Sequence, residues 1–530
     1  MVEPAPDAAK TRRQVNCAGD GSDHAPASPT LFIASSLPAL FGVLLVLTIT
    51  ARHGPGVTPD SVSYLSAARS LLAGEGFRGP DGEAYVAFPP LFPALIATTS
   101  LGMFDPVDAA TALVAVSFGV TILATGWLAG RITGSAPAAV AAALAVLLST
   151  PVLDAALHIW SELLFMAFSA LGLGALAIET TRPTTRRTMA TATITAALAS
   201  LTRYVGVTLT LTQILTASAR PGATAVSRLR AAGVALIGLI PLLLWLIRNW
   251  LVSGTPAGER YPAATSFAEN ARAAIEALLI WLVPLNAPMR FHALLLLLAV
   301  ALVLAVVAPP AIHGRSHNRR LLWACMPLVA FCSLYLLYLV LAASVTALDP
   351  IDDRLIAPLL PPAIVLVFAL GHGAVSLHGP WQRTGQIVAL VLLCLWLTVS
   401  AGDTIRLVRR AASDGVAGYA DATWQRSETL AALRTQPPSG MLYSNDPFAI
   451  AYHTEREARL SPRRHPYRSP GTAVDDIPSL QAALASGDEV FLVWFDGVPR
   501  DFLFSPGELA MILELQPVAR FDDGAVYRLR

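Results

Sequence analysis

Charged side chains are scarce in this sequence. Asp, Glu, Lys and Arg make up 14% of its 530 residues, whereas 54% of the residues are hydrophobic. Soluble domains carry about 25% charged residues, so the deficit indicates that lipid is the main solvent of the chain. The net charge is only +1 and the basic residues are scattered, so the chain has no overall field that would attract nucleic acid, and we expect no nucleic-acid partner.

Cysteine and the common catalytic signatures are also sparse. One of the four cysteines lies in the N-terminal tail and three lie in apolar runs. The sequence therefore predicts neither a disulfide framework nor a zinc-ligand spacing. No GxGxxG, P-loop, HExxH, GxSxG or CxxC pattern occurs in a suitable context. Any chemistry must come from acids and arginines.

Long apolar runs, by contrast, are abundant. Residues 1–30 are rich in Ala, Pro, Asp and Ser, which indicates a disordered tail. The run at 31–50 is long enough to cross a ~30 Å hydrocarbon core at about 1.5 Å per residue. A signal peptide is the competing interpretation, but the preceding tail is long and no small-residue cleavage site follows, so we expect a retained helix. Further spanning helices are expected at 107–130, 136–154, 160–179, 189–202, 204–217, 231–252, 291–312, 321–344, 355–374 and 387–403.

The predicted body is therefore a polytopic α-helical membrane protein with about 11 transmembrane helices. The pair at 189–202 and 204–217 is the weakest of them, because each half is short and Arg203 lies between the two. This pair forms either a tight helical hairpin or one kinked, tilted span.

The charges of the connections give these helices a direction. With the N-terminus inside, every inner connection is basic with scarcely an acid beside it, as the positive-inside rule requires. The inner arginines are Arg131, Arg182, Arg186, Arg187, Arg220, Arg228, Arg230, Arg315, Arg319, Arg320 and Arg383. The outer acids are Asp60, Glu75, Asp81, Glu83, Asp105, Asp108, Asp154, Glu162, Glu259, Glu269, Asp349, Asp352 and Asp353. We therefore predict a multi-pass protein of the plasma membrane with a cytoplasmic N-terminus.

The largest outer connection of the membrane body, residues 51–106, contains two helical stretches. Thr58 as N-cap and Pro59 at the first helical position open the first stretch, and Gly74 closes it. Its apolar residues fall on one face, which is typical of a helix that lies in the membrane interface. The second stretch, at 89–103, is apolar all round. A crossing there would invert the charge pattern downstream, so we place it on the outer surface.

The character of the chain changes at about residue 405. Charges return, strand-like runs appear at 440–443, 489–495 and 525–529, and helical stretches lie at 422–433 and 479–485. This pattern predicts a small soluble α/β domain of ordinary size, which lies outside after an odd number of crossings. The predicted organisation is a cytoplasmic tail (1–30), a transmembrane module (31–404) and an extracytoplasmic domain (405–530).

Four charged residues near the outer membrane face are candidates for chemistry. Asp60 has a plain interpretation as a first-turn acid that complements the helix dipole, worth about 0.3–1 kcal/mol, and its spacing alone favours that interpretation. Asp154 and Glu162 flank the next outer turn. Glu162 enters an apolar span, where a carboxylate needs a partner or a function. Arg203 either snorkels to the surface or holds an anion.

Two more clusters lie at the outer ends of later spans. Arg248 and Asn249 are followed by Glu259 and Arg260, and this local departure from the positive-inside trend argues against a purely topological role. The acidic segment that ends at Arg354 stands just before the next span. It is either a solvated turn capped by acids or part of a site.

Taken in order, several short stretches form a recognisable series with a shared outer placement. They are 58–64 (TPDSVSY) with 67–69 (AAR), 88–91 (FPPL) with Pro93, 161–164 (SELL), 201–204 (LTRY), 247–250 (IRNW), and 349–354 (DPIDDR) with Pro358. This series, spread over most of residues 30–405, resembles the GT-C superfamily of membrane glycosyltransferases, of the mannosyltransferase or aminoarabinose-transferase kind. The stretch 442–445 (LYSN) looks like part of the accessory domain that many bacterial members carry.

The resemblance implies roles for individual residues. Asp60 corresponds to the first outer-loop aspartate, which is the catalytic base of that family. Glu162, with Asp154, lies where many members carry a second acid, often Asp, that helps to bind a metal or the acceptor. Arg203, Arg260 and Arg354 are the candidates for the lipid phosphate. No cofactor is certain, and a divalent cation, Mg²⁺ or Mn²⁺, stays open.

The implied activity transfers a sugar from a polyprenyl-phosphate donor to a hydroxyl of a glycan, lipid or protein acceptor, with inversion at the anomeric carbon. A carboxylate must accept the proton of so weak an acid as a sugar hydroxyl, and arginines stabilise the leaving phosphate. A transporter or lipid flippase is the alternative, although it would be expected to place ionisable groups near the bilayer midplane and often to show an internal repeat. A membrane scaffold that only displays the C-terminal domain would leave Glu162, Arg203 and Arg248 unexplained.

Overall fold

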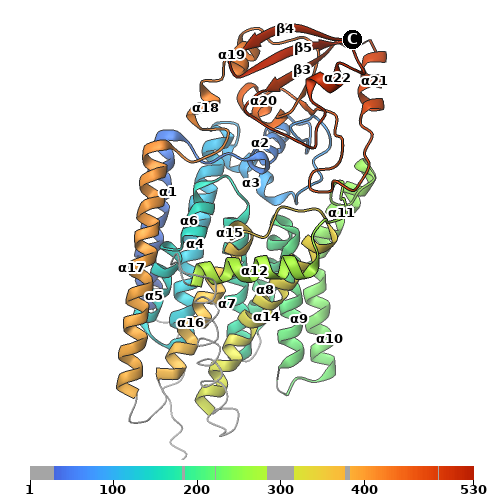
Figure 1. The fold of residues 1–530 in the computed structure, drawn as a ribbon. Helices are drawn as coiled ribbons and strands as arrows, with labels where there is room; N and C mark the ends of the chain where they lie inside the picture. The colour runs from blue at the N-terminus through green and yellow to red at the C-terminus, as the bar shows by residue number, and fades with distance from the viewer. Residues whose placement is uncertain (1–28, 182–184, 221, 283–315, 376–381, 488) are drawn as a thin grey trace, which may run out of the picture.

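The computed structural model describes residues 29–181, 185–220, 222–282, 316–375, 382–487 and 489–530. Figure 1 shows an elongated molecule in which a bundle of helices carries a smaller α/β unit at one end. The chain ends in this α/β unit, whereas α1 and α17 run side by side along one edge of the bundle.

The bundle is built from helices of very different lengths. They are α1 (Pro29–His53), α2 (Pro59–Leu72), α3 (Leu91–Ser100), α4 (Pro106–Thr133), α5 (Ala136–Leu147), α6 (Thr150–Leu157), α7 (Glu162–Thr181), α8 (Arg186–Thr202), η1 (Tyr204–Gly206), α9 (Val207–Ala219), α10 (Ala225–Ile237), α11 (Ile240–Ser253), α12 (Phe267–Leu282), α14 (Ser316–Val345), α15 (Asp353–Ile356), η2 (Ala357–Leu359), α16 (Leu360–Val375) and α17 (Gln382–Asp414). Most run along the bundle, whereas α12 lies across it (Figure 1).

Within the described ranges, six helical segments are long and apolar enough to cross a membrane, and two bent pairs bring the number to as many as eight. The six are Pro29–His53, Pro106–Thr133, Glu162–Thr181, Arg320–Val345, Asp353–His372 and Leu390–Asp414. The predicted spans at 136–154 and 231–252 each fall on a bent pair, α5 with α6 at 57° and α10 with α11 at 42°. The chain is thus a multi-pass membrane protein. The predicted span at 291–312 lies outside the described residues, and the total of about 11 stays a prediction.

The ambiguous pair around Arg203 is a helical hairpin. Gln213 Nε2 of α9 donates to Thr193 Oγ1 of α8 at 2.9 Å, and these two residues lie at equal distances on either side of Arg203. The turn requires a glycine, because a Cβ on Gly206 would lie 2.4 Å from the backbone carbonyl carbon of Ala199. Two antiparallel helices therefore replace the kinked span that the sequence also allowed.

The two helices of the first outer connection have the expected bounds but not the expected environment. Helix α2 begins at Pro59, and Ser61 Oγ accepts from the Thr58 N–H at 3.0 Å. Helix α3 has ten residues, a length of about 15 Å that is too short to cross a membrane. The apolar face of α2 was expected in the membrane interface. Instead Val62 and Leu65 are fully buried in the protein core, where α2 packs against α3 and α4.

The C-terminal unit contains a mixed five-stranded sheet of order β2-β1-β3-β5-β4. Strands β2 and β3 pair with β1 in parallel, whereas β5 pairs antiparallel with both β3 and β4. Its elements are α18 (Ala422–Gln425), α19 (Glu428–Thr435), β1 (Met441–Ser444), α20 (Pro447–Thr454), β2 (Arg459–Leu460), α21 (Ile477–Ala485), β3 (Val490–Phe495), α22 (Pro506–Leu509), β4 (Leu515–Phe521) and β5 (Gly524–Leu529). The expected strands at 440–443, 489–495 and 525–529 correspond to β1, β3 and β5. The boundary at 404 stays a prediction, since α17 continues through it to Asp414.

The C-terminal unit sits on the loops that hold the predicted outer acids. The Tyr419 N–H donates to the Val57 carbonyl at 2.8 Å, and the Ala458 N–H donates to the Pro80 carbonyl at 3.1 Å. Ion pairs add to these contacts: Arg69 with Glu455 at 3.3 Å, Arg459 with Glu83 at 3.0 Å, Arg463 with Glu259 at 3.3 Å and Arg468 with Asp349 at 3.6 Å. The acidic connections therefore gather at the same end of the bundle as the C-terminal unit.

Candidate active site

Two segments far apart in the sequence meet at the end of the bundle nearest the C-terminal unit. The Gly56 N–H donates to the Leu157 carbonyl at 2.8 Å, and the Ile159 N–H donates back to the Gly56 carbonyl at 3.0 Å. Only glycine fits at position 56, since a Cβ there would lie 2.2 Å from the ring of His158. This pairing brings the start of α2 beside the start of α7. It is the reason that Asp60 and Glu162 lie close together.

Arg354 links these two carboxylates. Its Nη2 lies 2.5 Å from Asp60 Oδ2, and its Nε lies 2.6 Å from Glu162 Oε1. Arg203 reaches the same oxygen of Glu162 from the turn between α8 and α9, with Nη1 at 2.7 Å. Two guanidinium groups and two carboxylates thus form one continuous chain of ion pairs, Asp60–Arg354–Glu162–Arg203.

Arg354 is held by more than its ionic contacts. The guanidinium carbon lies 4.1 Å from the ring centroid of Trp160, a distance at which a cation is attracted by an aromatic face. The indole Nε1 of Trp160 in turn donates to Thr58 Oγ1 at 2.9 Å. On the other side, Asp352 caps the short helix α15 by accepting from the Leu355 N–H at 3.1 Å. The position of Arg354 is therefore fixed from three elements.

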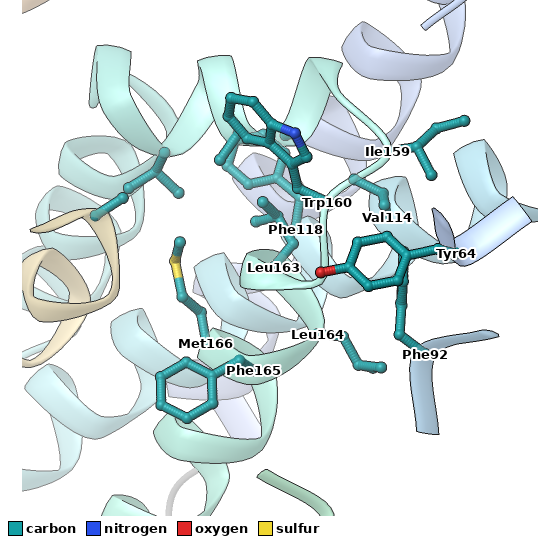
Figure 2. Packing of buried hydrophobic residues seen from close by; sticks show 14 of the residues in the cluster. Tyr64, Phe92, Val114, Phe118, Ile159, Trp160, Leu163, Leu164, Phe165 and Met166 are labelled. Atoms are coloured by element: carbon teal, nitrogen blue, oxygen red, sulfur yellow. The ribbon is translucent and has the colours of Figure 1, made fainter. Parts of the chain in front are cut away.

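A polar contact and an aromatic wall support the inner side of the network. Arg203 Nη1 also donates to Ser161 Oγ at 3.3 Å, and the hydroxyl of Tyr64 lies 3.2 Å from the same oxygen. Figure 2 shows Tyr64 beside Phe92 and the first residues of α7; the Tyr64 and Phe92 rings meet edge-on at 5.0 Å. Burial, together with the negative charges of Asp60 and Glu162, raises the pKa of the Tyr64 hydroxyl. Tyr64 therefore stays neutral beside two carboxylates.

The members of the network differ in their access to solvent. The Glu162 side chain is 0% exposed, whereas that of Asp60 is 28% exposed. Glu162 Oε2 is buried and has no hydrogen-bond partner among the described residues. A buried carboxylate of this kind is stable only because two arginines compensate its charge. Glu162 is thus the anchor of the network, and Asp60 is the carboxylate that a ligand can reach.

The donor set does not fit the divalent cation that the sequence left open. In the part of the chain that the structure describes, no three His, Cys, Asp or Glu side chains gather as a metal site would need. The one Glu162 oxygen with contacts faces two guanidinium groups, whose positive charge would repel a second cation.

Two predicted site residues lie apart from the network. The Asp154 side chain is 42% exposed and has its Oδ1 3.9 Å from His158 Nδ1. Arg260 is exposed and forms no hydrogen bond or ion pair with any described residue. Arg260 lies in the loop that follows α11, beside Glu259 and Tyr261, which contact Arg463 of the C-terminal unit. The structure therefore brings together four of the six predicted residues.

Sequence reasoning missed the residues that position the network. Trp160 contacts Arg354, Ser161 contacts Arg203, and Tyr64 contacts Ser161. Tyr64 and Ser161 lie in the stretches 58–64 and 161–164 that carried the resemblance, but no charge marked any of the three as a site residue. The cluster around Arg248 has a positioning role as well. Arg248 Nη1 donates to the Tyr85 carbonyl at 2.8 Å, and Asn249 Nδ2 donates to the Val86 carbonyl at 3.3 Å. These contacts fix the first outer connection against α11.

One further acid borders the site from the C-terminal side. Asp349 lies in the loop before α15, outside the spanning helices, and pairs with Arg468. Partial burial, and then the nearby charge of Asp60, raise the pKa of its carboxyl group. Asp349 is therefore close enough to Asp60 to feel its charge, although the two side chains share no contact among the described residues.

The whole fold resembles that of several solved membrane proteins. ArnT from Cupriavidus metallidurans bound to undecaprenyl phosphate matches with a TM-score of 0.57 and 16% identity, over 94% of this chain and 97% of that one. AglB from Archaeoglobus fulgidus, an oligosaccharyltransferase solved with an inhibitory peptide and a dolichol-phosphate, matches with a TM-score of 0.51 and 13% identity over 87% and 69% of the two chains. The mycobacterial arabinofuranosyltransferase AftD matches with a TM-score of 0.50 and 16% identity over 93% and 41%.

No protein-family model and no curated protein sequence matches the chain. The structural likeness alone therefore carries the comparison, and at these identities it concerns the fold. Its coverage of 94% of the chain includes both the helix bundle and the α/β unit. The GT-C fold that the short sequence stretches indicated is confirmed.

Proposed function

We propose that this protein is a glycosyltransferase that moves a sugar from a polyprenyl-phosphate donor to an acceptor hydroxyl, with inversion and with Asp60 as the general base. The observation that carries the proposal is the ion-pair chain Asp60–Arg354–Glu162–Arg203 at one end of an apolar bundle. The fold supports it, because two proteins that share this fold were solved with undecaprenyl phosphate and with a dolichol-phosphate.

Asp60 has the geometry that a general base needs. Arg354 occupies Oδ2, and no described residue donates to Oδ1, which is left to accept a proton from the acceptor hydroxyl. The side chain is 28% exposed, so an acceptor reaches it from outside the bundle. The hydroxyl is too weak an acid to attack unaided, and a positioned base contributes about 10²–10⁴-fold to the rate.

Arg354 is suited to hold the phosphate of the donor. Its Nε and Nη2 are used by the two carboxylates, which leaves Nη1 and the second hydrogen of Nη2 to form a fork toward a phosphate. The carbon–oxygen bond to this phosphate breaks as the acceptor oxygen bonds to the anomeric carbon. The leaving group is already anionic, so it needs charge stabilisation more than protonation. Arg354 thereby holds the base and the leaving group in one geometry.

The remaining predicted residues take supporting roles in this proposal. Glu162 orients Arg203 and Arg354, which keeps both guanidinium groups ionised and in place. The four charges of the network sum to zero, so an arriving phosphate needs a further cation. Arg260 is such a cation at the outer rim, and Asp154 remains a candidate contact for the acceptor. Binding of the acceptor by Glu162 stays a prediction.

The proposal includes an orientation in the membrane. Residues 31–404 form the catalytic module, the N-terminus is cytoplasmic, and the α/β domain at 405–530 is extracytoplasmic in the plasma membrane. The end of the bundle that carries Asp60 is then the outer face. A transporter or flippase is less well supported, because the ionisable network lies at one end of the bundle, near the C-terminal unit, and a transporter typically binds its cargo near the midplane.

A transfer assay with a matched control tests the proposal. Purified protein receives a labelled polyprenyl-phosphate sugar and candidate acceptors, with Asp60→Asn and Asp108→Asn beside the wild type. Asp108 occupies the first turn of α4, as Asp60 does in α2, so both changes remove the same helix-dipole contribution. We expect Asp60→Asn to reduce transfer about 10²–10⁴-fold and Asp108→Asn to leave it near the wild-type rate.

Two outcomes of this assay would contradict the proposal. Transfer that survives Asp60→Asn undiminished would contradict Asp60 as the base. Movement of the lipid across vesicle membranes without any transfer of sugar would favour the flippase instead.

A further inference from the structure

Two adjoining cavities lie where the first outer connection meets the C-terminal unit. Their volumes are about 280 and 390 Å³, and both are lined by Asp81 and Arg459. Together they exceed the ~300 Å³ at which ligand pockets of proteins usually begin. We name this pair of cavities the junction groove.

The walls of the junction groove are held in place by backbone contacts. Arg78 and Ala84 form an antiparallel bridge, and Arg78 Nη1 donates to the Gly82 carbonyl at 2.8 Å. Asp81 lies at the tip of this small loop, where its Oδ1 accepts from the Glu83 N–H at 3.1 Å. The opposite wall comes from strands β1 and β2. Both walls are thus ordered before any ligand binds, which lowers the entropic cost of binding.

Acids and arginines alternate along the lining. Arg459 pairs with Glu83 at 3.0 Å, and Arg463 pairs with Asp476 at 2.7 Å. Because these charges are mutually compensated, the lining does not favour a ligand of high charge of either sign. It offers carboxylate acceptors next to guanidinium donors, interspersed with apolar patches such as Met441 and Leu460.

One lining residue has an unused donor. Arg456 Nη2 donates to the Pro438 carbonyl at 2.6 Å, but its Nη1 is buried without a hydrogen-bond partner in the described part of the chain. A buried guanidinium N–H without a partner is costly. Because this nitrogen is shielded from solvent, a ligand in the junction groove would reach it only after the Arg456 side chain moves.

We propose that the junction groove binds the saccharide part of the acceptor. Sugar rings carry hydroxyls on their edges and C–H groups on their faces, which matches a lining of paired charges and apolar patches. The junction groove and the candidate site share the first outer connection, which carries Asp60 at the start of α2 and Asp81 in the loop that follows that helix. This inference rests on the proposed glycosyl transfer and adds the chemical class of the acceptor.

Binding measurements on the full-length protein in lipid nanodiscs test the junction groove. The probes are neutral linear tetrasaccharides of hexoses and pentoses, with a mixed-sequence decapeptide for comparison, followed by saturation-transfer NMR. We expect Arg459→Ala and Asp81→Ala to weaken binding of the neutral tetrasaccharide roughly tenfold or more, since each removes charged hydrogen-bonding groups. Arg459→Lys should weaken this binding less, because lysine keeps the positive charge and loses only the two parallel N–H donors of the guanidinium group.

A matched control separates the groove from general surface effects. Arg520→Ala removes an exposed arginine that pairs with Asp496 at 2.6 Å on β4, away from the groove, and should bind the probe as the wild type does. In the transfer assay, Arg459→Ala should raise the KM for the saccharide acceptor and leave kcat nearly unchanged.

The outcomes distinguish this inference from the proposed function. Tetrasaccharide binding by a wild-type protein that transfers no sugar to any acceptor would support the junction groove as a saccharide site and overturn the proposed reaction. Three results would overturn the assignment of the junction groove as a saccharide site. They are equal binding by the wild type and Arg459→Ala, absence of binding by every neutral tetrasaccharide, and preference for the decapeptide.

Discussion

Two groups of arginine–carboxylate pairs in this molecule lie under opposite conditions. In the buried network of the candidate site, Arg203 and Arg354 meet Glu162, whose side chain is 0% exposed. At the junction with the C-terminal unit, Arg459, Arg463 and Arg468 meet acids whose side chains are 61–67% exposed. The chemistry of the two groups is the same. The two groups differ in how far their carboxylates are exposed to water.

The difference in burial sets what each group of pairs contributes. Removing one partner of a buried pair leaves an uncompensated charge and costs about 3–5 kcal/mol. An exposed pair is worth about 0–1 kcal/mol, because water already stabilises both ions. The network therefore fixes the geometry that the proposed reaction needs, whereas the junction pairs lie between the C-terminal unit and the loops beneath it.

The largest effect should follow from Glu162→Gln. This change keeps the shape of the side chain but leaves Arg203 and Arg354 without the shared negative charge. We expect the free energy of unfolding to fall by about 3–5 kcal/mol and transfer to be lost as both arginines shift. Unfolding in detergent micelles, followed by circular dichroism, measures the first effect.

Glu276→Gln is the control for this change, since Glu276 pairs with Arg272 at 2.7 Å on the exposed face of α12. An i,i+4 pair of that kind contributes about 0.3–0.5 kcal/mol. Equal losses for Glu162→Gln and Glu276→Gln would show that the buried network is no more costly to break than a surface pair.

A smaller effect is expected from exchanging the two arginines of the network for lysine. Arg354→Lys cannot contact Asp60 and Glu162 through two separate nitrogens, so it loses at least one charged hydrogen bond, worth about 1.5–3 kcal/mol. That corresponds to roughly a 10–150-fold lower kcat/KM for the donor. Arg203 reaches Glu162 through Nη1 alone, and Arg203→Lys should cost less. A larger loss of kcat/KM for Arg203→Lys than for Arg354→Lys would indicate that Arg203 holds the donor phosphate.

Trp160→Phe should have a modest effect. The change removes the hydrogen bond from Nε1 to Thr58, with a net value of about 0.5–1.5 kcal/mol, and weakens the contact of the ring with Arg354. We expect roughly a fivefold lower kcat, since 1.4 kcal/mol corresponds to a factor of about ten. The melting temperature, measured in parallel, should change little. A large drop in the melting temperature with unchanged kcat would mean that Trp160 contributes only to core packing and does not position Arg354.

Much of the fold was predictable because its signals are local. Six expected spans correspond to six apolar helices, and Thr58, Pro59 and Gly74 marked the bounds of α2. The strands β1, β3 and β5 were visible as apolar runs. Strand β4 was not, because it lies at the edge of the sheet with mostly exposed residues, so that its sequence lacks the apolar pattern of a buried strand.

The candidate site was predictable as a set of residues but not as a network. Asp60, Glu162, Arg203 and Arg354 each stood out as a charge next to an apolar run. Their connection depends on the pairing of Gly56 with the segment after α6, which is a contact between distant parts of the chain. Arg260 stood out by another local signal, because it belongs to a basic cluster that departs from the positive-inside trend. It lies outside the network because it belongs to a loop whose neighbours contact the C-terminal unit.

The smallest effect on the free energy of unfolding should follow from Asp349→Asn. This change removes the pair with Arg468 at 3.6 Å, which is exposed and worth little. It also removes a carboxylate whose pKa is raised by burial and by the charge of Asp60. A raised pKa means that the folded state binds the proton more tightly than the unfolded state does, so the wild type loses stability as the pH rises above the ordinary value of about 3.8.

At neutral pH the two contributions oppose each other, and we expect a change of less than about 1 kcal/mol, with Asp349→Asn the less pH-dependent protein. Unfolding measured between pH 4 and pH 8 checks this. A loss as large as that of Glu162→Gln would mean that the junction pairs behave as buried ones, and the contrast between the two regions would no longer hold.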